Sequence, residues 1–109
     1  MLKQAVYYKT PSGKRPLEQW LKRIKDETAK AIIYKGLQKL EQGYRGNCKS
    51  LGGDLQELKF HYGPGYRIYF AEFESMLILL LSGGTKNTKK EQQQDIAQAR
   101  AYLQEFLAR

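Results

Sequence analysis

The fold is constrained most by a strand-rich stretch between Glu57 and Ser82, which two short turns divide into three segments. Before the Gly-Pro-Gly turn at 63–65, apolar and polar residues alternate: one face carries Leu58, Phe60 and Tyr62, the other Glu57, Lys59 and His61. A second strand is predicted over 66–73 and a third over 76–82, with a turn centred on Glu74 and Ser75. Hairpin turns join neighbouring strands, so strand 66–73 is expected at the centre of an antiparallel unit.

Helical patterns lie on both sides of this unit. Residues 4–8 predict a first strand, and Pro16 suits the first turn of a helix whose apolar positions are Leu17, Trp20, Leu21 and Ile24. Asp26 is a candidate cap for a second helix, which should end near Gly43 and carry the apolar stripe Ala29, Ile32, Ile33, Leu37 and Leu40. These two segments predict a helical hairpin.

A last helix is predicted from Thr88. Thr88 and Glu91 have the spacing of a capping box, and the apolar face that follows is Ile96, Ala99, Leu103, Phe106 and Leu107. The element order is therefore β-α-α-β-β-β-α. We expect a single domain over 1–109, of the α+β class, with a small, mostly antiparallel sheet packed by helices.

Charge and composition limit the classes of partner and the compartment that we expect for this protein. Nineteen Lys and Arg against 11 Asp and Glu give a net charge of +8, which favours nucleic acid, an acidic protein or an anionic surface, with a solvated basic surface as the plain alternative. Cys48 is the only cysteine, which fits a reducing compartment. The apolar run 76–81 is far shorter than the ~20 residues that span a bilayer, and residues 1–9 lack a signal-peptide core. We expect a cytoplasmic protein that does not bind a membrane.

Pairing across the two turns predicts which side chains share a face. If Tyr62 lies opposite Tyr66, the core face holds the pairs Phe60–Ile68 and Leu58–Phe70, and the other face holds His61–Arg67 and Lys59–Tyr69. If Phe73 lies opposite Met76 in the second hairpin, Tyr69 faces Leu80 and Arg67 faces Ser82. Arg67 should then point outward at one end of the sheet.

This pairing gathers Lys59, Arg67 and Lys86 on the non-core face, with His61 and Tyr62 nearby. Arginine can hold a phosphate with two parallel N–H bonds, and lysine adds a compact charge. Tyr62 and Tyr69 could stack on unpaired bases, and the helix start at Thr88 favours an anion. Each residue also has a plainer interpretation: Arg67 as a cross-strand partner of Glu57 or Glu72, Lys59 as a solvated cation, and Tyr69 as a core residue under the last helix.

The segments "KSLGGDLQELKFHYGPGYRIYF" and "LILLLSGGTKNTKKEQQQDIAQARAYL" resemble the RelE/ParE superfamily of toxins, in particular its phage-derived HigB-like branch of addiction module killer proteins. The resemblance covers most of the chain. It implies an endoribonuclease (mRNA interferase) with no metal and no cofactor, which cuts mRNA in the ribosomal A site and inhibits translation. It also implies a cognate antitoxin with a helix-turn-helix, through which the complex would contact operator DNA.

The resemblance also assigns candidate roles to residues. Arg67 matches the arginine that binds the scissile phosphate, Lys59 an active-site lysine, and Lys86 the basic position after the last strand. Glu57 stands where some RelE members have another lysine, and the catalytic Tyr or His near the C-terminus of several members has no counterpart here. Glu57, His61 and Lys59 remain candidate bases. RNA binding is expected from Tyr62, Lys89, Lys90, Arg45 and Lys49.

Two further functions stay open at this point. The ParE branch shares the fold but poisons DNA gyrase, so this chain could inhibit a macromolecule without cutting RNA. A decayed toxin could instead survive as a module that binds its antitoxin and operator DNA.

Overall fold

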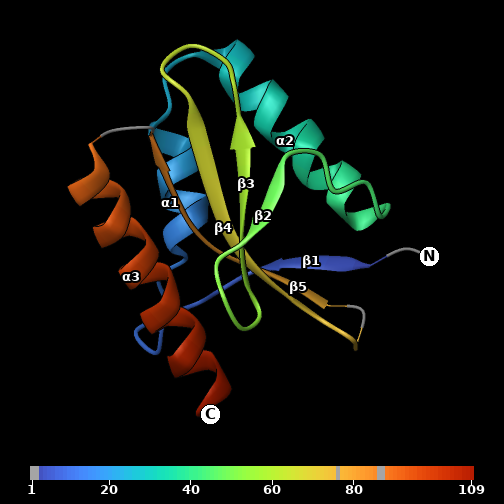
Figure 1. The fold of residues 1–109 in the computed structure, drawn as a ribbon, viewed down its shortest axis with the longest axis vertical. Helices are drawn as coiled ribbons and strands as arrows, with labels where there is room; N and C mark the ends of the chain where they lie inside the picture. Colours follow the sequence, from blue (N-terminus) through green and yellow to red (C-terminus); the bar gives the residue numbers. More distant parts are fainter. Residues whose placement is uncertain (1–2, 76, 86–87) are drawn as a thin grey trace.

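The computed structural model describes residues 3–75, 77–85 and 88–109 (Figure 1). The elements in chain order are β1 (Gln4–Tyr7), α1 (Pro16–Arg23), α2 (Glu27–Glu41), β2 (Cys48–Ser50), β3 (Leu55–Phe60), β4 (Tyr66–Phe73), β5 (Leu77–Thr85) and α3 (Lys89–Leu107). Within these described residues, no helix combines the length and apolar character needed to cross a membrane.

One five-stranded sheet organises the molecule, with strand order β1-β5-β4-β3-β2. β1 runs parallel to β5, and the other neighbours are antiparallel. The predicted α+β class and the central place of strand 66–73 are confirmed. β2 was not predicted, because its three residues lie in a polar, glycine-rich connection with no alternation long enough to indicate a strand.

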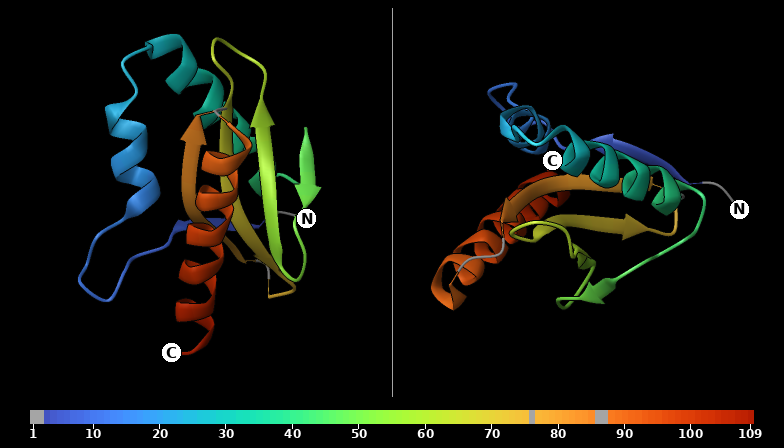
Figure 2. Two further views of the ribbon diagram at one scale, coloured as in Figure 1. Left: turned by 60° about the vertical axis from the view of Figure 1, so that its left-hand side comes forward. Right: turned by 90° about the horizontal axis from the view of Figure 1, so that it is seen from above.

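Helices cover both faces of the sheet, and Figure 2 shows the sheet between α1 and α2 on one side and α3 on the other. The α1/α2 side buries one core, built around Leu21, Ile33, Ile68 and Phe70. The α3 side buries a second core, which contains Tyr8, Leu55, Tyr69, Leu79, Leu81 and Leu103. The prediction that the face carrying Arg67 is not a core face is therefore wrong, because α3 packs on it.

Local signals place the helix ends where the sequence predicts them. Pro16 is the first residue of α1, and the Asp26 carboxylate accepts hydrogen bonds from the N–H groups of Thr28 and Ala29 at the start of α2. The Thr88 hydroxyl accepts from the N–H of Glu91 at the start of α3. These bonds satisfy N–H groups that the first helical turns leave free.

The β3–β4 register differs by two residues from the predicted one. Phe60 pairs with Tyr66 and Lys59 with Arg67, so the connection spans residues 61–65 and His61 lies outside the strand. The predicted pairs His61–Arg67 and Lys59–Tyr69 are wrong. A slip of two residues keeps each side chain on its face, since the pleat repeats every two residues. The slip brings Lys59 and Arg67 directly together.

The β4–β5 register also differs from the predicted one, by one residue from the turn onward and by a second residue at a bulge between Tyr69 and Phe70. Phe70 pairs with Leu80 and Tyr69 with Ser82, so β5 gains one residue at Leu81. Arg67 therefore lies opposite Gly84, and not opposite Ser82 as predicted. The predicted partner of Phe73, Met76, lies outside the described residues; Phe73 pairs with Leu77.

Candidate functional site

Arg67 and Glu57 form a buried ion pair between β4 and β3. Their exposed fractions are 8% and 1%, and Nε of Arg67 lies 3.0 Å from Oε1 of Glu57. Oε1 has no hydrogen-bond partner within the described residues, so this contact is an ion pair whose N–H is not aligned on the oxygen. The prediction that Arg67 faces outward is wrong, because α3 and the neighbouring strands cover this face.

Lys59 connects this buried pair to the surface. It lies opposite Arg67 in the β3–β4 register, is half-buried, and places Nζ 4.0 Å from Oε1 of Glu57. A small pocket of about 50 Å³ opens beside the two cations and is also lined by His61 and Tyr66. His61 is exposed, and its Nε2 lies 2.7 Å from Nδ2 of Asn47. From the interior to the surface, the site therefore consists of a buried cation (Arg67), a half-buried cation (Lys59) and an exposed imidazole (His61).

A second carboxylate approaches Arg67 from α3. Asp95 packs onto Gly84, the residue opposite Arg67, so closely that a Cβ at Gly84 would overlap the Asp95 carboxylate. Burial, followed by the nearby charge of Glu91, raises the pKa of Asp95, and the Arg67 guanidinium only partly offsets this rise. The absence of a side chain at Gly84 is what lets α3 bring this carboxylate to the sheet.

Two hydroxyl groups complete the polar interior under α3. Tyr69 and Ser82 are register partners, and neither Oη of Tyr69 nor Oγ of Ser82 has a hydrogen-bond partner within the described residues. Burial, and then the charges of Glu57 and Asp95, raise the pKa of Tyr69 to about 12, so its phenol stays protonated at neutral pH. Tyr69 thus belongs to the second core, in agreement with its alternative interpretation as a core residue under the last helix.

The residues predicted to bind RNA lie outside the buried Arg67–Glu57 pair. Lys89 and Lys90 are exposed at the start of α3, and Tyr62 packs against the core on the α1/α2 side. Lys49 is exposed on β2, opposite Glu57 in the register. Arg45 is exposed and hydrogen-bonds to Glu72 and Gln56. Lys86 lies outside the described residues.

Asp95 was missed by sequence reasoning. Its position one residue before Ile96 of the apolar stripe placed it beside the buried face of α3, but nothing local indicated Gly84 beneath it. Among the described residues, no group of three or more His, Cys, Asp or Glu side chains is arranged to hold a metal ion.

Comparisons with known proteins agree with this architecture. A family model described as "Phage derived protein Gp49-like (DUF891)" matches residues 19–104. An uncharacterized protein of Haemophilus influenzae is 38% identical over 89 residues, which cover 82% of this chain and 87% of the relative. The solved structure of a mutant of the E. coli toxin RelE in the free state matches 89% of this chain and 97% of its own, with a TM-score of 0.64 and 13% identity. The RelE-like fold expected from the sequence is confirmed.

Proposed function

The chain belongs to the Gp49-like family of phage-derived proteins, and from this premise we propose that it is the toxin of a type II toxin–antitoxin system. Its activity would be cleavage of mRNA on the ribosome, which inhibits translation, and its partner a cognate antitoxin. The observation that carries the proposal is the direct pairing of Lys59 with Arg67 at the open end of a RelE-like sheet, beside His61.

The positions of these groups support phosphate chemistry. Arg67 offers planar N–H donors to the oxygens of a scissile phosphate, and Lys59 places a second cation beside it. Preorganised donors aimed at developing negative charge supply the largest share of many enzymatic rate enhancements. The cross-strand register places Lys59 and Arg67 opposite each other on one face, so one phosphate could contact both side chains once Arg67 turns from Glu57.

In the proposed reaction, the RNA 2′-oxygen forms a bond to the adjacent phosphorus as the bond from phosphorus to the 5′-oxygen breaks. The 2′-hydroxyl proton passes to the imidazole of His61, or to Lys59 in its neutral amine form, and the leaving 5′-oxygen takes a proton from water to become a hydroxyl. The products are a 2′,3′-cyclic phosphate and a free 5′-hydroxyl. His61 is the exposed candidate for the base; because Nδ2 of Asn47 can only donate, it occupies the lone pair of Nε2, and the imidazole must release this contact to accept a proton.

Glu57 takes a positioning role in this scheme. With 1% of its surface exposed, it is poorly accessible to a substrate hydroxyl, but it lies 3.0 Å from Arg67 and holds the guanidinium in the sheet. The pocket of about 50 Å³ has room for a few water molecules, so a phosphate enters only when Arg67 turns partly away from Glu57. Substrate binding therefore exchanges one anionic partner of Arg67 for another.

The burial of Arg67 also favours a second candidate function, in which the protein binds and inhibits a macromolecule without cutting RNA. Inhibition of DNA gyrase, as in the ParE branch of this fold, is one such activity. In that case the cations outside the core would contact the target, and Arg67 would be a structural residue.

One induction experiment separates these functions. The chain is expressed, and the 5′ ends of cellular mRNA are mapped by primer extension with translation active and with translation blocked. Discrete cuts that require translation are expected. DNA damage signalling with intact mRNA would identify gyrase inhibition instead, and growth arrest with neither signal would refute both activities.

A further inference from the structure

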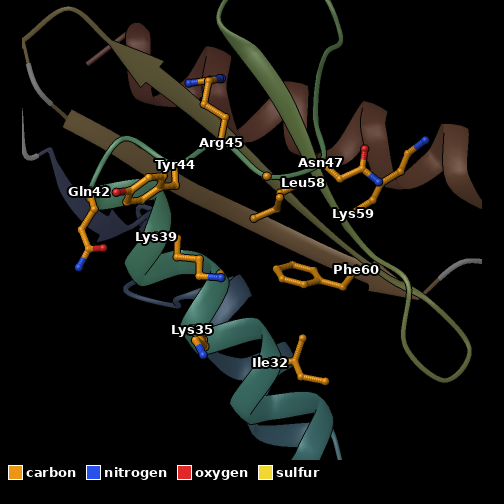
Figure 3. A pocket seen from close by; sticks show the side chains of 12 residues that line it. Ile32, Lys35, Lys39, Gln42, Tyr44, Arg45, Asn47, Leu58, Lys59 and Phe60 are labelled. Carbon is orange, nitrogen blue, oxygen red and sulfur yellow. The ribbon is translucent and has the colours of Figure 1, made fainter.

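A large hollow of the described surface lies on the α1/α2 side of the sheet, opposite α3. It is a groove of about 710 Å³ between α2, the segment 42–47 and the end of β3 (Figure 3). Pockets that hold ligands span roughly 300–1,000 Å³, so this groove is large enough for several side chains of a partner. Of the candidate catalytic residues that the structure describes, Lys59 alone lines it.

The floor of the groove is apolar. Ile32 of α2 and Leu58 and Phe60 of β3 extend toward the space between the two elements (Figure 3). Gly36 permits this arrangement, because a Cβ on it would come within 2.5 Å of the Phe60 ring. The ring therefore lies against the helix backbone, and a shallow apolar trough remains open to solvent.

The rim of the groove is basic. Its charged lining residues are all cations, namely Lys35, Lys39, Arg45 and Lys59. Arg45 and Lys59 approach Glu72 and Glu57, whereas no carboxylate of the described residues lies within ion-pair distance of Lys35 or Lys39. One helical turn separates these two lysines, so they present unpaired positive charge along one side of the apolar floor.

We propose that this groove binds an acidic amphipathic segment of the neutralising protein partner. Apolar side chains of the segment would fill the trough over Ile32, Leu58 and Phe60, and its carboxylates would pair with Lys35 and Lys39. The proposal rests on the toxin function proposed above and names the surface by which that toxin is recognised.

The lining favours a protein over single-stranded RNA. RNA grooves hold successive bases on flat aromatic rings, but here two of the three floor residues are aliphatic, Phe60 is the ring of the floor, and the second ring, Tyr44, lies at the edge. An apolar floor with Tyr44 and Arg45 at its edge has the composition of a protein interface. Tyr44 is 66% exposed and offers a large apolar contact.

The groove also reaches the candidate catalytic site. Lys59 and Phe60 line both the groove and the small pocket beside Arg67. A segment anchored in the groove would therefore end next to the cations of that pocket. Neutralisation follows from this continuity, because the bound segment blocks the approach of a phosphate.

The test uses the full chain and the purified protein encoded by the gene next to its own. The variant Lys35→Glu/Lys39→Glu reverses the unpaired charges, and Ile32→Glu places a carboxylate over the floor. The control Lys14→Glu/Lys25→Glu makes the same change in net charge at two exposed lysines outside the groove. Dissociation constants are measured by titration calorimetry, and circular dichroism verifies that each variant is folded.

We expect the partner to bind both groove variants at least about tenfold more weakly than wild type, and the control within about twofold, because like charges across an interface repel strongly. In cells, the partner should rescue growth from the wild-type toxin but not from the Lys35→Glu/Lys39→Glu toxin. Equal rescue, equal affinity for the groove variants, equal loss in the control, or no binding by the wild type would each overturn the proposal. Loss of RNA binding with unchanged partner affinity would assign the groove to RNA and also overturn it.

Failure of this proposal is distinguishable from failure of the toxin function. Translation-dependent cuts in mRNA report the toxin, and they should be the same for wild type and Lys35→Glu/Lys39→Glu without the partner. The affinity for the partner tests the proposed role of the groove, and this test does not depend on whether RNA is cut.

Discussion

Breaking the Glu57–Arg67 pair should destabilise the protein strongly, whereas replacing both residues together should cost much less than the two single changes combined. At 3.0 Å and an effective dielectric constant of about 20, the Coulomb attraction between the two charges is about 5.5 kcal/mol. The cost of removing both charges from water offsets most of this attraction. The pair therefore adds little net stability, but either charge left alone in the interior is costly.

We expect Glu57→Leu and Arg67→Met each to lower the free energy of unfolding by about 3 kcal/mol, the low end of the range for breaking a buried pair. The low end applies because Lys59 remains beside Glu57 and Asp95 remains beside Arg67. The double variant should also cost about 3 kcal/mol or less, so the two residues should show a coupling of at least about 3 kcal/mol.

Urea unfolding of the four proteins measures these values, provided that the dependence of free energy on urea is the same for all of them. Single-variant costs that add within about 0.5 kcal/mol would refute the buried pair. A cost below about 0.5 kcal/mol for each single change would refute it as well, because it would mean that water reaches both charges.

Three further variants test other parts of the structure. Asp95→Asn should stabilise the protein at pH 7, because the raised pKa of this carboxyl means that folding disfavours its charged form. Wild type should therefore lose stability relative to the variant as the pH rises from the ordinary Asp range through the raised pKa. Urea midpoints of the two proteins that do not converge at low pH would contradict this. Gly83→Ala should cost about 1–3 kcal/mol, because its Cβ would lie 2.5 Å from the Trp20 ring, and an unchanged thermal midpoint would show that the ring moves freely. Tyr8→Phe should lower the free energy of unfolding through the lost 2.5 Å hydrogen bond to Glu105, and the same urea assay would show no change if α3 is not held there.

The parts of the fold that depend on local chemistry were predictable from the sequence. Asp26 and Thr88 cap helices through bonds to N–H groups two or three residues away, and strand 66–73 has the bounds that alternation and its turns indicate. β2 was not predictable in this way, because three residues carry too little periodicity and the strand exists only through its pairing with β3.

The sequence predicts only part of the candidate site: it brings Arg67 and Lys59 to one face of the sheet, but it does not indicate Asp95 of α3 beside them. Arg67 and Lys59 were identified, but their direct pairing depends on the length of the 61–65 connection, which turn residues alone do not determine. The burial of Arg67 depends on α3 covering that face. The continuous apolar run 77–81 is a signal for this, since strands covered on both faces lack alternation.

The central claim is that Arg67 binds the scissile phosphate, and the most direct test is the rate of mRNA cleavage on isolated ribosomes programmed with a defined message. Arg67→Met is compared with Glu57→Leu, the matched control that loses the same ion pair and a similar amount of stability but keeps the arginine. We expect Arg67→Met to cleave about 10²–10³-fold more slowly than wild type, and Glu57→Leu to stay within about tenfold of it. Cleavage by Arg67→Met at a rate close to that of wild type would contradict the claim.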